Sequence, residues 1–388
     1  MSMRSPEARL SSATPAVQDL ATVAGKYAQQ ADSERRPADE VVAGIRLAGF
    51  ARHFVPASFG GDEGSFTRLL PQVCAVAREC PSAGWIASLT AHTGRMAGYL
   101  PEQGQRELWH HGPDVLVSGA LVPSGKATPT AGGWQVSGRW NYVSGADFAD
   151  WALVCTEVES GAGPQSWCLA IPRADYATED TWFNVGMRAT GSNTVVVDDL
   201  FVPRHRSFPR ADLEAGLSDG RAGSCYRAPL KAVNGLSFVV PLLGAAQGMA
   251  GHWIDWIGRK TDTHTGARTR DRQSVQSDLA HSTAEIAAAE LLVHSIAERA
   301  DSGAGLRPHI ALHMRDWSFA SELVKSAAQR IFQASGTSGQ HENAPVQRFW
   351  RDIHSAASHF ALQLTQAAGQ YAEETFRSET AGRSNENA

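Results

Sequence analysis

The sequence predicts an α+β protein in which two helical segments flank a segment of short β-strands. Apolar residues recur every three or four positions from Thr14 to about Gly112, as in amphipathic helices. From about Val115 to Phe208 they alternate with polar residues, as in half-buried strands. The helical spacing then returns after a Gly-rich linker at 215–224. The expected domains are an N-terminal helical domain, a central β domain and a C-terminal helical bundle, at residues 1–114, 115–214 and 215–388.

Helix starts and stops delimit the elements of the N-terminal domain. Pro37 precedes an amphipathic run that Gly49 ends, because proline suits the start of a helix and glycine its end. Two further helices are expected at Phe66–Glu79 and Ala83–Tyr99, and a fourth begins after Pro101.

Five short runs separated by Gly, Pro and Asp clusters are expected to be strands. They begin at Val115, Trp134, Trp151, Trp167 and Thr194. Within this segment the stretch GRWNYVSGADFADW, residues 138–151, places alternating aromatic residues before a Ser-Gly-Ala-Asp loop. A flat aromatic side chain beside a serine hydroxyl suits a planar heteroaromatic ligand. The alternative is a β-hairpin that contains a packed tryptophan.

The C-terminal domain contains two clear apolar stripes of helical spacing. One follows Ser274, and the other predicts a single continuous last helix. The residues of that last stripe are Ile353, Ala357, Phe360, Leu364, Ala367 and Tyr371.

Composition excludes several classes of function. A net charge of −5 without a basic run gives no support to a nucleic-acid partner. No run of about 18 apolar residues is evident, so no membrane span is expected, and the cytoplasm is the default location. The five scattered cysteines form no CxxC pair. The histidine pairs 110–111 and 309/313 lack an HExxH context, so we expect no metal site. Neither a P-loop nor a GxGxxG fingerprint is present.

Three motifs resemble signatures of the acyl-CoA dehydrogenase superfamily and occur in the same order. They are GMRATGSN from Gly186, QSVQSDLA from Gln273, and QASGTSG from Gln333, which is followed by PVQRFWRD from Pro345. The resemblance covers nearly the whole chain. It implies an N-terminal helical domain, a central β-barrel-like domain and a C-terminal four-helix bundle.

Two departures from the dehydrogenase pattern indicate a different reaction. No acid follows Arg351-Asp352 before Glu373, where dehydrogenases commonly carry a catalytic glutamate. The family's TEPxAGSD segment is replaced by GALVPSGK from Gly119. Both features, with GRWNYVSGAD, are similar to the two-component flavin-dependent monooxygenases (group D) on this scaffold.

This resemblance implies a reaction, a cofactor and partners. Such oxygenase components, usually homotetramers, receive reduced flavin (FADH2 or FMNH2) from a separate NAD(P)H:flavin reductase. They react with O2 through a C4a-(hydro)peroxyflavin to hydroxylate an aromatic or polycyclic small molecule such as an indole, a phenol or a polyketide-like compound.

The resemblance also assigns roles to residues in the first two domains. Ser144 matches the serine that contacts the flavin, Trp140 would pack against the ring system, and Asn141 would lie nearby. His92 would face the substrate, and an ordinary histidine pKa near neutrality suits proton transfer. The plain alternatives are a turn serine and a packed core histidine.

In the C-terminal domain, His359 matches the second catalytic histidine better than His354 does. Spaced five residues apart on one helix, the two would point in different directions. Arg268 or Arg270 would hold the flavin phosphate, unless that segment is only a solvated loop. The remaining cofactor-binding positions, which would meet the flavin tail of a neighbouring subunit, are Gln333 and Gly336.

Other functions remain open at this point. An acyl-CoA dehydrogenase with bound FAD, an amine N-oxygenase on the same scaffold, and a catalytically silent binding protein are the alternatives. The choice between FAD and FMN, and the identity of the substrate, are not fixed by the sequence.

Overall fold

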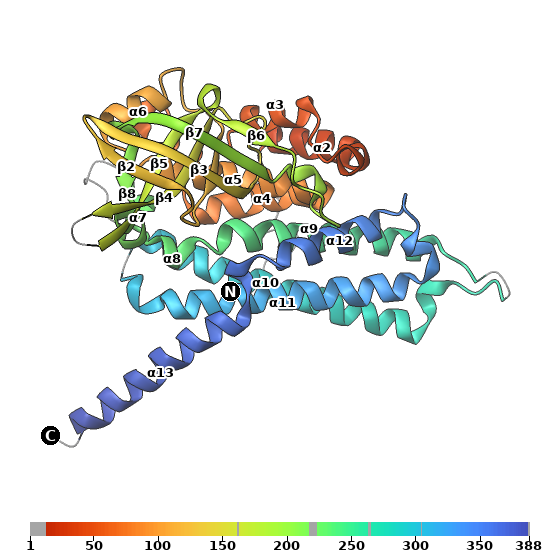
Figure 1. Ribbon diagram of the computed structural model, residues 1–388. Coiled ribbons are helices and arrows are strands. Elements are labelled where there is room, and N and C mark those ends of the chain that lie inside the picture. The colour runs from red at the N-terminus through yellow and green to blue at the C-terminus, as the bar shows by residue number, and fades with distance from the viewer. Residues whose placement is uncertain (1–12, 161–162, 217–222, 263–264, 304, 387–388) are drawn as a thin grey trace.

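A computed structural model describes the chain at residues 13–160, 163–216, 223–262, 265–303 and 305–386. The N-terminal helices and the β-sheet lie side by side over one face of a bundle of long helices (Figure 1). The order helical, β, helical confirms the predicted α+β class. Most of the Gly-rich linker predicted at 215–224 lies outside the described residues.

The N-terminal helices follow the predicted pattern closely. Ser65 caps the third helix by accepting a hydrogen bond from the backbone N–H of Arg68 at 3.2 Å. That helix spans the same residues that its apolar spacing predicts. The helices are α2 (Pro15–Glu34), α3 (Asp39–Leu47), α4 (Phe66–Glu79), α5 (Pro81–Ala97) and α6 (Glu102–Leu108).

The central domain is one eight-stranded sheet with the order β6-β7-β3-β2-β4-β5-β8, and β1 pairs with β4 in parallel. Three of its strands, β2, β6 and β8, were not expected from the sequence because they are short and carry little apolar alternation. The strands are β1 (Val117–Ala120), β2 (Lys126–Thr130), β3 (Gly133–Val143), β4 (Trp151–Ser160), β5 (Gly163–Pro172), β6 (Ala177–Glu179), β7 (Asn193–Pro203) and β8 (Ser207–Pro209).

The sheet separates two hydrophobic cores. Along β4, Ala152 and Val154 lie in a core formed within the β domain. Leu153 and Cys155, on the opposite face of the same strand, belong to the large core shared with the helices. Because alternate residues of a strand point to opposite faces, one face of the sheet packs on the helices. The residue that follows β3, Ser144, and the turn that precedes β7 then lie against α5.

The helices of the C-terminal part complete the fold. Four of them, α9 to α12, pack together as the predicted four-helix bundle. The helices are α7 (Arg210–Ala215), α8 (Leu230–Val233), α9 (Leu236–Arg259), α10 (Gln273–Ser302), α11 (Ile310–Ser335), α12 (Pro345–Ala357) and α13 (Leu364–Glu386).

Glycine allows the three inner helices to approach closely. A Cβ atom placed on Gly84 of α5 would lie 2.4 Å from the Cβ of Ala77 in α4. One placed on Gly244 of α9 would lie 2.8 Å from the same Ala77 Cβ. Since real carbon atoms do not approach so closely, α5 and α9 can contact α4 only because both positions lack a side chain.

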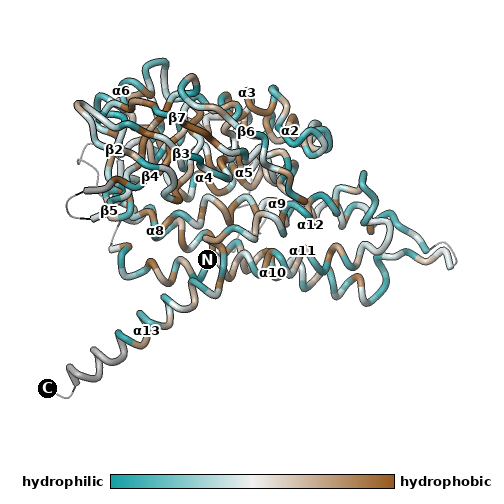
Figure 2. Tube along the Cα trace, in the orientation of Figure 1, coloured by the Kyte–Doolittle hydropathy of each residue, from teal (hydrophilic) through white to brown (hydrophobic). Residues whose placement is uncertain are grey.

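The segment Leu230–Arg259 corrects the expectation that no part of the chain is apolar enough to cross a membrane. By length and composition it could do so, but 83% of the 18-residue apolar stretch within it is buried inside the protein. It contacts α4, α5, α10, α11 and α12, so its hydropathy is that of a central core helix. In Figure 2 the hydrophobic colouring gathers on such inner segments.

The prediction of one continuous last helix is wrong. From Ile353 the chain stays helical only to Ala357. A 3₁₀ turn, η9, follows at Phe360–Leu362, and α13 then begins at Leu364 and projects from the body of the protein (Figure 1).

Local hydrogen bonds explain the break. The hydroxyl of Ser358 donates to the carbonyl of Ser355 at 2.6 Å, a local bond that competes with helix continuation. The indole N–H of Trp317 donates to the carbonyl of Ala361 at 2.8 Å, and Leu362 is buried. Tertiary contacts thus hold this turn out of the helix, although the apolar spacing continues through it.

Candidate active site

Helix α5 places three polar or aromatic side chains on one of its faces. Trp85, Ser88 and His92 are spaced three and four residues apart, which aligns them along the helix. All residues of α5 except Leu89 are buried, so this face points into the protein interior. At 1.5 Å per residue, Trp85 and His92 lie about 10 Å apart along the axis.

Ser144 lies where β3 ends, next to Trp85. The indole N–H of Trp85 donates to the Ser144 hydroxyl oxygen at 3.1 Å, and Ser192 lies 2.8 Å from that oxygen on its other side. The backbone turns sharply here, with positive φ angles of 63° at Tyr142 and 76° at Gly145. A positive φ at a tyrosine is uncommon and marks a locally constrained segment.

The motif that begins at Gly186 is held in place by α12. The Thr190 hydroxyl lies 2.7 Å from that of Ser192 and donates to the carbonyl of Met187 at 2.8 Å. The Met187 N–H in turn donates to the carboxyl group of Asp352 at 2.6 Å. Burial raises the pKa of this carboxyl group to about 7. The arginine-aspartate motif therefore anchors the loop that carries the two hydroxyls.

His359 occupies the break between α12 and η9. Its ring stacks on Phe238 at a centroid distance of 3.9 Å and approaches Trp85 at 6.1 Å. Burial lowers its pKa to about 4, so the imidazole is neutral near pH 7. Its Nδ1 accepts the backbone N–H of Ala361 at 3.3 Å. The single ring proton must then lie on Nε2, which makes this atom a hydrogen-bond donor.

The ring proton of His92 lies on the other nitrogen from that of His359. Its Nδ1 donates to the carbonyl of Ser88 at 2.9 Å, so the neutral ring carries its lone pair on Nε2. This Nε2 is buried and has no hydrogen-bond partner among the described residues. His92 lines a cavity of about 10 Å³ whose other residues are mostly apolar. A buried acceptor without a partner is costly, so this atom is a candidate contact for a bound molecule.

The pKa of His92 corrects one sequence expectation. Burial lowers it to about 3 instead of leaving it near neutrality. The side chain is therefore suited to accepting a hydrogen bond and orienting a hydroxyl group more than to removing its proton.

Trp140 and Asn141 do not share the position of Ser144 beside Trp85. Trp140 is 1% exposed, belongs to the core within the β domain, and donates its indole N–H to the carbonyl of Cys155 at 2.6 Å. It has no free face on which a flavin ring could lie, because it points into the sheet interior. Asn141 is exposed and accepts a hydrogen bond from the Thr194 hydroxyl at 2.9 Å.

The remaining predicted positions lie at the far end of the bundle from the β domain. Arg268 and Arg270 are exposed in the connection between α9 and α10, which projects beyond the bundle (Figure 1). Gln333 and Gly336 are exposed at the C-terminal end of α11. One chain does not bring these four residues to Ser144.

His354 is separate from the site as well. Its Nδ1 donates to the carbonyl of Trp350 at 2.9 Å, and its ring lies 4.7 Å from the Trp350 ring. Of the two histidines after the arginine-aspartate motif, His359 alone contacts Trp85.

Sequence reasoning missed four residues that build the site, namely Trp85, Phe238, Thr190 and Ser192. The spacing of Trp85 and His92 on one helix face was an available signal. Thr190 and Ser192 lie in the GMRATGSN motif, which was used for the fold but not for the site. Nothing in the sequence pairs Phe238 with the site.

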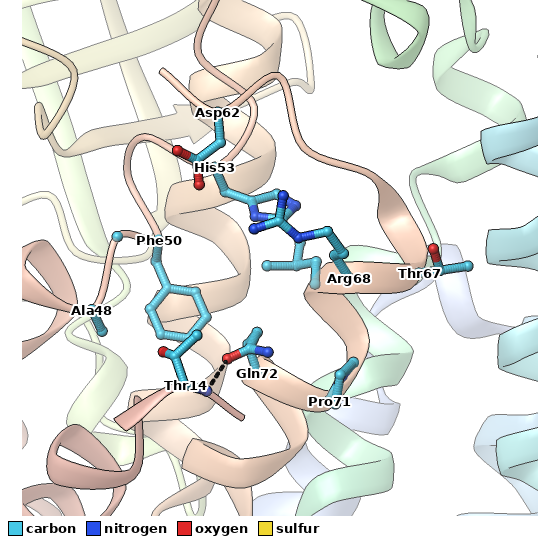
Figure 3. Close-up of a pocket in the computed structure, with 11 residues that line it drawn as sticks. Thr14, Ala48, Phe50, His53, Asp62, Thr67, Arg68, Pro71 and Gln72 are labelled. Carbon is cyan, nitrogen blue, oxygen red and sulfur yellow. Dashed lines mark hydrogen bonds between the residues drawn. The ribbon is translucent and has the colours of Figure 1, made fainter. Parts of the chain in front are cut away.

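A wider pocket lies elsewhere. Its volume is about 420 Å³, and it opens beside α4, where Phe50, His53, Asp62 and Arg68 line it (Figure 3). The Gln72 side chain accepts the backbone N–H of Thr14 at its edge. None of the predicted site residues lines this pocket.

Comparison with known proteins places this geometry in a family. Residues 236–364 match the family described as acyl-CoA dehydrogenase, C-terminal domain. The oxygenase component of the FADH2-dependent resorcinol hydroxylase from a Rhizobium species is 30% identical, with 92% of this chain and 91% of that protein covered. The oxygenase subunit HsaA of a flavin-dependent monooxygenase from Rhodococcus jostii is also 30% identical, with 89% and 93% covered.

Solved structures agree. The crystal structure of 3-HSA hydroxylase from a Rhodococcus species superposes with a TM-score of 0.89 at 27% identity, covering 93% of this chain and 96% of that chain. The structure of XiaF from a Streptomyces species, in complex with FADH2 and glycerol, gives a TM-score of 0.88 at 26% identity, covering 95% and 96%. The chain belongs to the oxygenase components of two-component flavin-dependent monooxygenases, within the acyl-CoA dehydrogenase fold superfamily.

Proposed function

We propose that this chain hydroxylates an aromatic or polycyclic small molecule, using reduced flavin and O2. A hydrogen-bond donor and a hydrogen-bond acceptor both lie against Trp85, and this observation carries the proposal. His359 presents Nε2–H and Ser144 presents a hydroxyl oxygen. Further along the same face of α5 lies the Nε2 of His92, which has no hydrogen-bond partner in the part of the chain that the structure describes. These groups fit the needs of a reduced flavin and a hydroxylated substrate.

Each residue has a distinct role in this proposal. Reduced flavin, when bound, supplies the electrons that activate O2. Ser144 would hold the flavin ring, and His359 would donate a hydrogen bond where negative charge develops on oxygen. His92 accepts a hydrogen bond from a substrate hydroxyl and orients the ring. Asn141, in β3 and three residues before Ser144, would lie near the flavin edge.

Assembly completes the proposed cofactor site. Arg268 and Arg270 suit the flavin phosphate, because guanidinium groups match its geometry. These arginines, Gln333 and Gly336 lie far from Ser144 in one chain. We therefore propose that a neighbouring subunit of a homotetramer supplies them. A separate NAD(P)H:flavin reductase supplies the reduced flavin, and we propose that both proteins work in the cytoplasm.

Stopped-flow absorbance tests the proposed function. Anaerobic protein with reduced FAD or FMN is mixed with oxygenated buffer, with and without a phenol or an indole. We expect a transient band distinct from both reduced and oxidised flavin, and a hydroxylated product. His359→Ala should shorten the transient, whereas His354→Ala, the matched control, should not. Direct formation of oxidised flavin without product, together with bleaching of bound FAD by an acyl-CoA, would instead indicate a dehydrogenase.

A further inference from the structure

Helix α4 borders two cavities. The inner one, of about 10 Å³, is lined by His92 and Ser88 of α5 and by apolar side chains of α4 and α9. The outer one, of about 420 Å³, is the pocket beside α4 that Figure 3 shows. Of the residues that the structure describes, only Leu69 lines both cavities.

The position of Leu69 on α4 explains why it borders both. Successive residues of an α-helix lie about 100° apart around its axis. Val73, which lines the inner cavity, is therefore about 40° from Leu69 in one direction. Gln72, which lines the outer pocket, is about 60° away in the other direction. Leu69 is 3% exposed, so its side chain fills the boundary between the two spaces.

The inner cavity is small and closely walled beside His92. The ring centroids of Phe54 and Phe66 lie 5.6 Å and 6.2 Å from that of His92, and both phenylalanines are buried. A volume of about 10 Å³ holds roughly one water-sized group. A substrate hydroxyl group bound to His92 would fill it, and a chain on the neighbouring ring carbon would meet the cavity wall.

We propose that Leu69 is a specificity-determining residue, which excludes phenols that carry a chain next to the hydroxyl group. The inference rests on the proposed function, in which His92 accepts a hydrogen bond from that hydroxyl. Whichever way the ring is turned, such a chain begins one ring carbon away from the enclosed hydroxyl. Leu69 is the part of the wall that has free space behind it, so its side chain sets the limit.

The outer pocket suits an uncharged chain. Phe50 and Pro71 provide apolar walls, whereas Arg68 and Asp62 carry charges of opposite sign and favour neither an anion nor a cation. The pocket is far larger than the inner cavity. A chain that passed the position of Leu69 would therefore have room to extend.

Chain length tests the proposal. The substrates are phenol, 2-propylphenol and 2-hexylphenol, a flavin reductase with NADH supplies reduced flavin, and kcat/KM for the hydroxylated product is expressed relative to phenol. The wild type should reject both alkylphenols. Leu69→Ala should accept both, with the relative value for 2-hexylphenol raised roughly tenfold or more. The isomer 4-hexylphenol carries its chain on the opposite ring carbon, so its relative value should not change.

Leu70→Ala is the matched control. Leu70 is 4% exposed and lines only the inner cavity. Its truncation removes the same three carbon atoms from the same core, so the two variants should lose similar stability. The space that it leaves is closed, so Leu70→Ala should admit the propyl chain at most and still reject the hexyl chain. Acceptance of the same chains by both variants would overturn the inference.

A second substitution tests whether the chain enters the outer pocket. Ala48 lines only that pocket, and Ala48→Trp in the Leu69→Ala background should abolish the gain for 2-hexylphenol without affecting phenol. A gain that persists in the double variant would refute the path. If the alanine variants do not fold, Leu69→Val and Leu70→Val remove one carbon atom each. Of these two, Leu69→Val should give the larger relative value for 2-propylphenol, and equal values would count against Leu69.

The wild-type protein distinguishes failure of the inference from failure of its premise. If it hydroxylates phenol and 2-hexylphenol equally well, the proposed function stands and Leu69 sets no limit. If neither the wild type nor any variant hydroxylates a phenol, the proposed function fails and the inference fails with it.

Discussion

Asp352→Asn tests how the buried carboxyl group controls stability. Burial raises the pKa of Asp352 in the folded protein to about 7, from an ordinary value of 3.8. The folded state therefore keeps its proton between these values while the unfolded state loses it. Stability from this group is fully present below pH 3.8 and is lost as pH rises toward 7. The gap of about 3 units, at about 1.4 kcal/mol per unit, corresponds to about 4 kcal/mol.

Asparagine cannot ionise, but it retains an oxygen that can accept the Met187 N–H. The free energy of unfolding, measured in urea at fixed protein concentration, should be similar for both proteins at pH 4. At pH 8 the variant should be more stable than the wild type by up to about 4 kcal/mol. Comparing the two curves cancels the titration of all other groups. Curves that stay parallel from pH 4 to pH 8 would refute the reasoning.

Four further substitutions test the site and its support. His92→Phe should lower kcat/KM for hydroxylation roughly 100-fold through misplaced substrate, with reduced-flavin affinity unchanged in titrations. His359→Ala should lower kcat roughly 100- to 1000-fold and divert O2 to hydrogen peroxide, measured by peroxide release. Trp85→Phe removes the N–H donated to Ser144 and should cost about 1 kcal/mol in urea unfolding. Gly84→Ala forces α4 and α5 apart and should cost about 1–3 kcal/mol in the same assay. Wild-type values for any of these variants would contradict the corresponding contact.

Much of the fold follows from periodicity, because the change between helical and strand spacing reflects which faces are buried. The helix Phe66–Glu79 is bounded by a serine cap and by a proline-led successor, both visible in the sequence. The break at Ser358 could not be predicted in this way. It depends on Trp317, which is distant in sequence and donates to the turn, while the apolar spacing runs through unchanged.

The site was predicted less completely than the fold. The resemblance identified Ser144 and His359, and the structure brings both to Trp85. It also suggested Trp140, which the sheet interior encloses, because strand alternation does not reveal which face is the core. Hydrogen-bond direction and the pKa of His92 depend on burial by distant segments, so no local pattern could supply them.

The burial of the two site histidines has a consequence for the pH optimum of the enzyme. Neither imidazole titrates near neutral pH, since their pKa values lie at about 3 and about 4. If the rate rises and then falls between pH 6 and 9, and any loss of stability through Asp352 is set aside, the groups whose titration causes these changes belong to the reactants. Substrates of different acidity should shift the optimum of one and the same protein, so a profile recorded with one phenol does not characterise the enzyme with another.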